Sequence, residues 1–122
     1  MSDPRTTDFV IALGASASQS VRSEDLYLHG LRAPTMEATT TMLYLETTED
    51  ADTVVDASAT WDPVFTAAGT RVSFAVSAAA PQRVQLDTPF GRFGRVRLVA
   101  VTAGGVAVVQ TAAKTIKPRW SG

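Results

Sequence analysis

The stretch TPFGRFGRVRLVAV, residues 88–101, decides the fold, because it sets a glycine-containing turn directly before an alternating strand. Val96 and Leu98 would face one side of that strand, and Arg95 and Arg97 would face the other. A phosphate cradle places glycine amides before a helix, whereas these glycines come before a strand. The stretch therefore predicts a turn that leads into an amphipathic strand, and nucleic acid is not an expected partner.

Outward arginines on such a strand have another use, because arginine is enriched at protein–protein interfaces. A tryptophan so close to the C-terminus is expected to pack against another surface, and a neighbouring subunit is a natural candidate for that surface. We therefore expect a subunit interface formed by Arg92, Phe93, Arg95, Arg97 and Trp120.

Alternating segments recur along the chain and are separated by Gly, Pro and polar residues, which predicts about seven to nine short strands. They lie at residues 9–13, 25–29, 40–46, 70–77 and 83–87, in addition to the strand of the opening stretch. Residues 61–65 read as a strand start, and residues 106–116 as one long bent strand or two short ones. We expect Gly30 to stop the second of these strands and residues 31–34 to form an edge segment or bend. The prediction is an all-β protein with a single antiparallel β-sandwich of jelly-roll or immunoglobulin-like type.

The 122 residues suit one domain, 1–122, with short tails at 1–8 and 117–122. Pro118 is expected to end regular structure. Residues 47–60 read as a polar loop that could hold a short strand at Val54-Val55, and residues 48–60 are the only segment in which a short helix would be tolerated. The absence of cysteine excludes disulfides, thiolate metal sites and cysteine nucleophiles. No signal peptide is visible and no apolar run approaches a membrane span, so we expect synthesis in the cytoplasm and no membrane partner.

Charge is distributed unevenly along the sequence. Residues 1–62 carry three arginines and eleven acidic residues, whereas residues 63–122 carry eight basic residues and a single acidic one, Asp87. If the fold places these acidic and basic residues on different faces of the molecule, the faces would favour contacts between copies, because complementary potentials fix register. Two solvated faces are the alternative interpretation.

Residue types that could carry catalysis are sparse. His29 is the only histidine, and we interpret it as structural or exposed. The acidic segment 46–56 lacks the central glycine and the terminal acid of an EF-hand, so a solvated loop is the expected form and a looser calcium site is the alternative. We expect no catalytic, metal or cofactor-binding residues and no enzymatic activity.

Aromatic side chains allow a second hypothesis from another functional class. Flat rings on a sandwich domain can stack on sugars, and the candidates are Trp61, Tyr27 and Tyr44. Trp61 would also serve as a core anchor. The alternative function is therefore a carbohydrate-binding adhesion module.

Taken in order, five segments resemble a family of small virion structural proteins encoded among the head and tail genes of tailed bacteriophages and prophages. These segments read DLYLHGLRAPTM (25–36), MLYLETTEDAD (42–52), WDPVF (61–65), GRFGRVRLVAVT (91–102) and VVQTAAKTIKPRW (108–120). The chain departs from the family pattern after the central strand, where Glu-Asp-Ala-Asp replaces the usual Asp-Gly.

The resemblance implies a β-sandwich virion protein that decorates the capsid surface or forms the base of a head spike or fibre. It would act as a homo-oligomer through multivalent contacts, with partners such as the major capsid protein or a spike or fibre protein. A tail or connector component, and a role in host attachment through glycans, are the other possibilities that it leaves open.

Overall fold

The computed structural model describes residues 8–22, 27–91 and 94–121 of the chain. These residues form nine strands and a short 3₁₀ turn, Asp56–Ser58, with no α-helix in the described ranges. The strands are β1 (Phe9–Ile11), β2 (Val21–Arg22), β3 (Tyr27–Ala33), β4 (Met42–Thr48), β5 (Asp62–Pro63), β6 (Ser73–Ala75), β7 (Gln82–Gly91), β8 (Arg95–Val101) and β9 (Lys114–Ser121). The expected all-β fold is confirmed.

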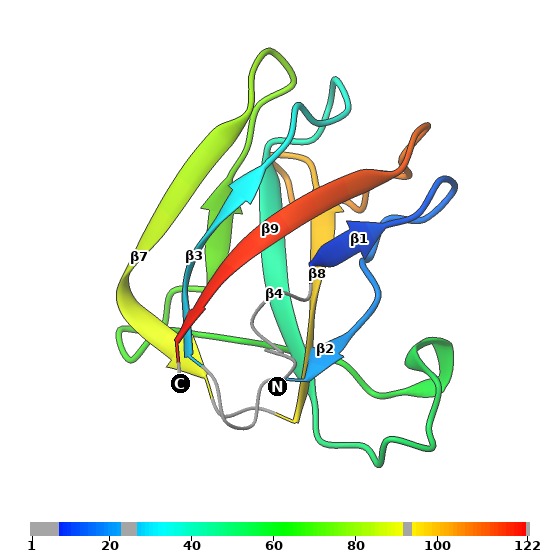
Figure 1. The fold of residues 1–122 in the computed structure, drawn as a ribbon, viewed down its shortest axis with the longest axis vertical. Coiled ribbons are helices and arrows are strands. Elements are labelled where there is room, and N and C mark those ends of the chain that lie inside the picture. Colours follow the sequence, from blue (N-terminus) through cyan, green and yellow to red (C-terminus); the bar gives the residue numbers. More distant parts are fainter. Residues whose placement is uncertain (1–7, 23–26, 92–93, 122) are drawn as a thin grey trace.

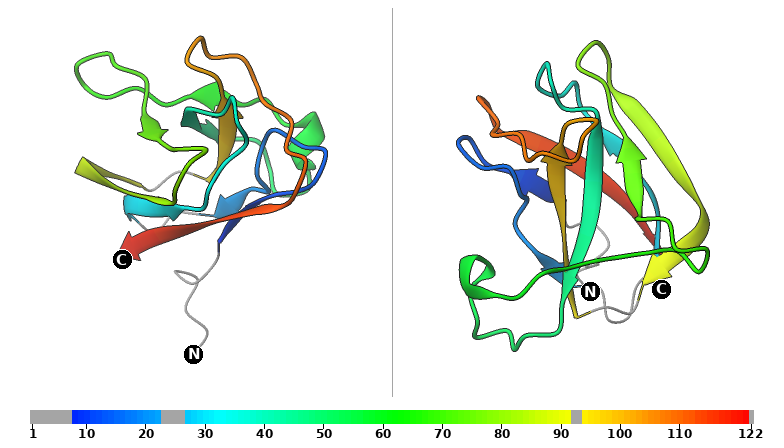
Figure 2. Two further views of the ribbon diagram at one scale, coloured as in Figure 1. Left: turned by 90° about the horizontal axis from the view of Figure 1, so that it is seen from above. Right: turned by 180° about the vertical axis from the view of Figure 1, so that it is seen from behind.

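The strands form two antiparallel sheets that pack face to face (Figures 1 and 2). One sheet has the order β1-β9-β3-β7, and the other has the order β2-β8-β4-β5, with β6 also paired to β4. Strands β5 and β6 pair with successive parts of β4 and so act as one interrupted strand. The pairs β1–β9, β2–β8, β3–β7 and β4–β5/β6 are then nested, as in a folded ribbon wound into two sheets. This topology is a jelly roll.

The core lies between the two sheets and is built of branched and aromatic side chains. The first sheet contributes Phe9, Ile11, Leu28, Leu31, Ile116 and Trp120, and the second contributes Leu43, Leu45, Phe74, Val96 and Leu98. Burial of this apolar surface is the main stabilising term of the fold. Chain connections cross from one sheet to the other, so these contacts join residues that are distant in sequence.

Strand β8 confirms the alternation predicted from the opening stretch. Val96 and Leu98 are buried in the core, while Arg97 lies on the outer face and is half-buried. Leu98 is opposite Leu45 in the register with β4. The predicted alternation in residues 70–77 is also confirmed, because Val72, Phe74 and Val76 are all buried.

The prediction that Gly30 ends a strand is wrong. Strand β3 continues through Gly30 to Ala33, and its register with both β7 and β9 shifts between Leu28 and Gly30, which marks a β-bulge. A Cβ atom on Gly30 would lie 2.3 Å from the carbonyl oxygen of Val84. The glycine therefore permits the close approach of β7 and does not stop the strand.

The predicted C-terminal tail 117–122 is also wrong, because β9 extends to Ser121 and Pro118 lies inside it, opposite Leu31. Proline is tolerated in a strand where no partner needs its missing N–H. Strand β1 pairs with β9 only from Lys114 to Ile116. At Pro118, β9 therefore pairs with β3 alone within the described part of the chain.

The remaining sequence-based expectations concern loops and the N-terminus. The polar connection, predicted at 47–60, spans residues 49–61, because Thr47 and Thr48 belong to β4. Its only helical element is the 3₁₀ turn, and no strand forms at Val54-Val55. Most of the predicted N-terminal tail, residues 1–7, lies outside the described residues, and Asp8 is irregular. Within the described ranges, no helix has the length and apolarity needed to cross a bilayer.

Candidate functional site

Five side chains form a continuous stack on the outer face of the β2-β8-β4-β5 sheet, which we call the arginine–aromatic ladder. Its members alternate aromatic or acidic groups with arginines, in the order Trp61, Arg97, Glu46, Arg71 and Tyr44. The ladder brings together one predicted interface residue, Arg97, and two predicted glycan-stacking residues, Trp61 and Tyr44.

Each contact in the ladder is short. The Arg97 guanidinium lies 4.3 Å from the ring centroid of Trp61, and the Arg71 guanidinium lies 3.9 Å from that of Tyr44. Between the two arginines, Glu46 accepts a hydrogen bond from Arg97 at 2.9 Å and another from Arg71 at 3.3 Å. The two cation–π contacts and the shared carboxylate fix both guanidinium groups.

Strand register explains why these residues meet. Glu46 on β4 is directly opposite Arg97 on β8, so the pair shares the outer face of the sheet. Trp61 immediately precedes β5, which pairs with β4 at Glu46. Arg71 lies beside β4, because the carbonyl of the next residue, Val72, accepts a hydrogen bond from the amide of Leu45 in that strand. The sequence showed Arg97 facing outward, but no spacing rule could place Arg71 or Trp61 beside it.

Arg95 lies at one end of the ladder and is buried, with a side chain only 8% exposed. It donates hydrogen bonds to the carboxylate of Asp56 at 3.1 Å and to the carbonyl of Ala51 at 3.4 Å. Its guanidinium is also 5.9 Å from the Trp61 ring centroid. The 49–61 loop covers Arg95, so its side chain is not exposed in the single chain, and its place in a subunit interface stays a prediction.

Asp56 connects this loop to Arg95 at the start of β8 and to Ser20, which directly precedes β2. Its carboxylate accepts hydrogen bonds from the backbone N–H and hydroxyl of Ser20, at 2.8 and 2.7 Å. The Asp56 carbonyl accepts a third hydrogen bond, from the indole N–H of Trp61 at 2.9 Å. Trp61 is half-buried outside the sheet and is not the core anchor that the sequence suggested.

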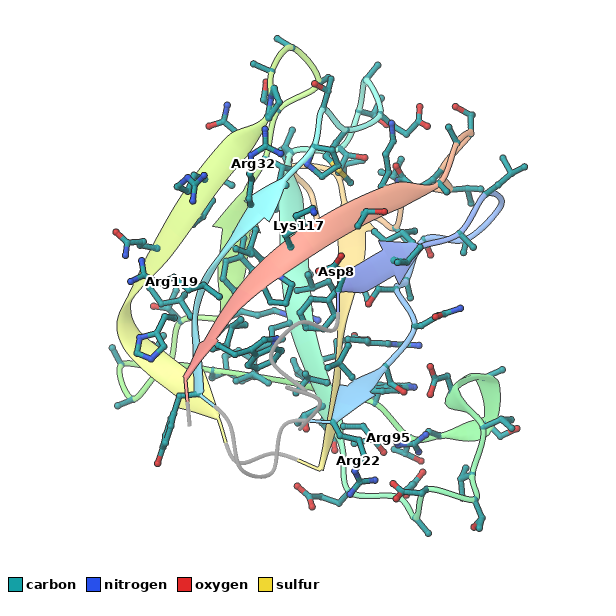
Figure 3. All side chains as sticks on the ribbon, in the orientation of Figure 1. Asp8, Arg22, Arg32, Arg95, Lys117 and Arg119 are labelled. Atoms are coloured by element: carbon teal, nitrogen blue, oxygen red, sulfur yellow. The ribbon has the colours of Figure 1, made fainter. Side chains whose placement is uncertain are left out.

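Other carboxylates of the acidic segment 46–56 are likewise bound within the chain. Asp50 accepts a hydrogen bond from the Thr60 amide at 2.7 Å. Asp52 forms an exposed ion pair with Arg22, which Figure 3 places beside Arg95. No cluster of three metal-ligating side chains occurs in the ranges that the structure covers. The loop forms an ion-paired cover over β8.

The uneven charge along the sequence is partly cancelled inside the molecule. Arg71, Arg95 and Arg97 from the second half of the chain pair with Glu46 and Asp56 from the first half. The jelly-roll pairing of early with late strands brings these opposite charges together. The two halves therefore do not form separate acidic and basic faces at this sheet.

The remaining predicted site residues do not join the ladder. Trp120 is 9% exposed and packs in the core, with its ring 6.0 Å from that of Phe9. It therefore docks on its own chain, and its contact with a neighbouring subunit stays a prediction. Tyr27 is half-buried at the start of β3, in the other sheet. Arg92 and Phe93 lie outside the described residues.

A second surface, which the sequence analysis missed, is formed by two loops at one end of the sandwich. The turn after β1 carries Leu13, and the β8–β9 connection carries Val109; these side chains are 69% and 60% exposed. Backbone hydrogen bonds at 2.9 Å join the loops, from Gly14 to Gln110 and from Gln110 to Ala15. Figure 1 shows the loops side by side. We call this surface the apolar end.

Comparison of the chain with protein-family models, with curated proteins and with solved structures gives no match.

Proposed function

We propose that this chain is a non-enzymatic structural protein of a tailed-phage virion, either a capsid-surface decoration protein or a subunit of a head spike or fibre base. In this role it binds copies of itself and other virion proteins, such as the major capsid protein. The resemblance of its strand-and-turn segments to small virion proteins supports the proposal. The jelly-roll topology is in keeping with it, since this fold recurs in viral capsid and lectin domains, although a fold alone does not define a function.

The observation that carries the proposal is the apolar end. Contiguous exposed apolar patches are characteristic of protein–protein contact sites. Leu13 and Val109 are held on loops that hydrogen-bond to each other, so few conformations are lost when a partner docks. A rigid apolar contact of this kind suits a protein that is repeated many times on a particle.

Quantitative mass spectrometry of purified particles, with heads and tails separated, tests the proposal. The expected result is that the chain is found in the head fraction. Many copies per head indicate a decoration protein, whereas a few copies in vertex-like multiples indicate a spike or fibre base. Recovery in the tail fraction indicates a tail or connector component, and absence from all particles refutes the structural role.

Matched variants then test the apolar end itself. Replacing Leu13→Ser together with Val109→Ser should lower the number of copies per particle without changing the melting temperature, because both side chains are exposed. Val55→Ser is the control, since Val55 is 64% exposed but lies on the 49–61 loop, away from the apolar end. Equal incorporation of the double variant and the wild type would refute the assignment of this surface.

Carbohydrate binding through Tyr27, Tyr44 or Trp61 is the alternative function and has less support. Arginine guanidinium groups already cover a ring face of Tyr44 and of Trp61. A sugar would have to use the opposite faces or displace the arginines from Glu46. Glycan binding that is lost in Trp61→Ala, with assembly unchanged, would nevertheless favour this function.

A further inference from the structure

Three basic side chains form a row across the outer face of the other sheet. Arg32 on β3 is directly opposite Arg83 on β7 on one side and directly opposite Lys117 on β9 on the other. Residues that face each other in adjacent antiparallel strands have Cβ atoms about 5 Å apart. Arg119 follows two positions along β9 and therefore points to the same face. We call these four residues the basic row.

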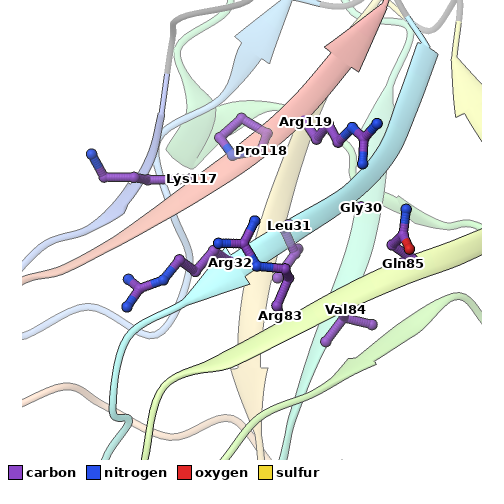
Figure 4. A pocket seen from close by; sticks show the side chains of 9 residues that line it. All are labelled: Gly30, Leu31, Arg32, Arg83, Val84, Gln85, Lys117, Pro118 and Arg119. Atoms are coloured by element: carbon purple, nitrogen blue, oxygen red, sulfur yellow. The ribbon is translucent and has the colours of Figure 1, made fainter.

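The basic row borders an open depression of about 350 Å³, shown in Figure 4. Its lining includes Gly30 and Pro118, two residue types that are uncommon inside strands. Gly30 carries no side chain, and Pro118 offers no backbone N–H. The cationic side chains stand around the depression on three neighbouring strands (Figures 3 and 4).

No member of the row forms an ion pair with any of the side chains that the structure describes. The four ion pairs there involve Arg22, Arg71, Arg95 and Arg97, and none of them involves a member of the row. Asp8 flanks the row on the β1 side, because it precedes Phe9, the register partner of Ile116, but it forms no ion pair with Lys117 in these ranges. All four basic residues of the row are exposed.

Like charges that face each other across strands destabilise a sheet. This row places such pairs on both sides of Arg32, and an anion seated between them would remove the repulsion. Arginine is well suited to such a ligand, since its planar guanidinium forms paired hydrogen bonds to phosphate or sulfate oxygens. The spacing across strands matches an anion with several charged groups better than a single small ion.

We propose that the basic row is a binding site for an anion that carries two or more adjacent phosphate or sulfate groups. Nucleic acid is a poorer ligand, because none of the residues lining the depression is aromatic and bases would find no stacking surface. The acidic loop of a second copy is also a poorer ligand. Asp50, Asp52 and Asp56 already bind groups of their own chain.

Thermal unfolding of the full chain at low ionic strength, with and without sodium tripolyphosphate, tests the proposal. A ligand that binds only the folded state raises the melting temperature with its concentration. We expect tripolyphosphate to raise it far more than monophosphate at equal concentration, and we expect high salt to abolish the effect. A sulfated oligosaccharide is the second probe. Stabilisation by either probe supports the site and identifies the anion, whereas stabilisation by neither overturns it.

The variant Arg32→Gln removes the central charge of the row. It should weaken tripolyphosphate binding by about tenfold, as expected when a charge-assisted hydrogen bond is lost. Without ligand, its melting temperature should equal or exceed that of the wild type, because cross-strand repulsion is relieved. This second measurement separates loss of the site from loss of the fold.

Arg22→Gln is the control, because it removes the same charge from an exposed side chain on β2, in the other sheet. Wild-type affinity is expected for this variant. An equal loss of affinity in both variants would mean that the probe senses only net charge, and this result would overturn the site. A short single-stranded DNA that binds the row more tightly than tripolyphosphate would overturn the proposed ligand class.

Discussion

The carboxylate of Asp56 binds the guanidinium of Arg95 at 3.1 Å across 39 positions of sequence. Arg95 begins β8, at the centre of one sheet, whereas Asp56 begins the 3₁₀ turn of the covering loop. This single pair therefore joins the loop to the sheet and neutralises a buried charge. Its removal should affect the stability of the whole domain.

The variant Asp56→Asn keeps the size of the side chain but leaves Arg95 without its counter-charge. Breaking a buried ion pair by removing one partner costs several kcal/mol. Because the Asp56 side chain is 34% exposed, we expect a smaller loss, of about 2 kcal/mol, in the free energy of unfolding. Urea denaturation followed by tryptophan fluorescence measures this loss.

The control for this prediction is Asp52→Asn. Asp52 lies on the same loop as Asp56, and this variant breaks its exposed ion pair with Arg22 on β2. Exposed pairs contribute about 0–1 kcal/mol. Equal losses of stability in the two variants would show that the burial of Arg95 does not increase the cost of losing its counter-charge.

Trp120 provides the second prediction, because the structure places it in the core. Trp120→Ala should lower the free energy of unfolding by about 3–5 kcal/mol through loss of buried area and creation of a cavity. If Trp120 contacted only a neighbouring subunit, its replacement would leave the stability of the isolated chain unchanged. Comparison of urea midpoints for the variant and the wild type, both as isolated chains, distinguishes these outcomes.

Residue alternation was enough to predict strands in which one face packs against the core and the other points away from it. In β8 and in residues 70–77, the inward side chains are apolar and the outward ones are mostly polar or charged, and the structure confirms both patterns. Gly30 and Pro118 were misread as strand ends. Whether such residues interrupt a strand depends on its neighbours, here the approach of Val84 and the short reach of β1.

The candidate sites were less predictable for a related reason. The outward position of Arg97 follows from local alternation, but its partners Glu46 and Trp61 come from segments that only the jelly-roll pairing brings together. The basic row likewise depends on register across three strands. A sequence shows which residues can form such groups, whereas the topology determines which of them meet.

A third prediction concerns the close approach at the β3 bulge. In Gly30→Ala the new methyl group would meet the backbone carbonyl of Val84, which cannot turn aside as a flexible side chain can. Overpacking of this kind costs about 1–3 kcal/mol. Gly104→Ala is the matched control, because its nearest neighbour would be the Thr102 hydroxyl at 3.8 Å. Equal melting temperatures for the two variants would contradict the tight packing assigned to Gly30.

A final prediction concerns the dependence of stability on pH. Hydrogen bonds from the hydroxyl and the amide of Thr111, both at 2.7 Å, hold the pKa of Glu37 below its ordinary value of 4.5. A carboxyl group whose pKa is lowered by folding stabilises the folded state above the unfolded pKa. That contribution disappears as the pH falls through the lower, folded value.

Glu37→Gln should therefore be less stable than the wild type at neutral pH, and the difference should shrink as the pH falls below about 4.5. Melting temperatures of both proteins, measured from neutral to acidic pH, provide the test. Glu49→Gln is the control, since Glu49 is an exposed carboxylate that directly follows β4, away from Thr111. A difference between Glu37→Gln and the wild type that stays constant with pH would show that the Thr111 contacts stabilise the charged and neutral forms equally. In that case the contact between Glu37, on the β3–β4 connection, and Thr111, on the β8–β9 connection, would not depend on the charge of Glu37.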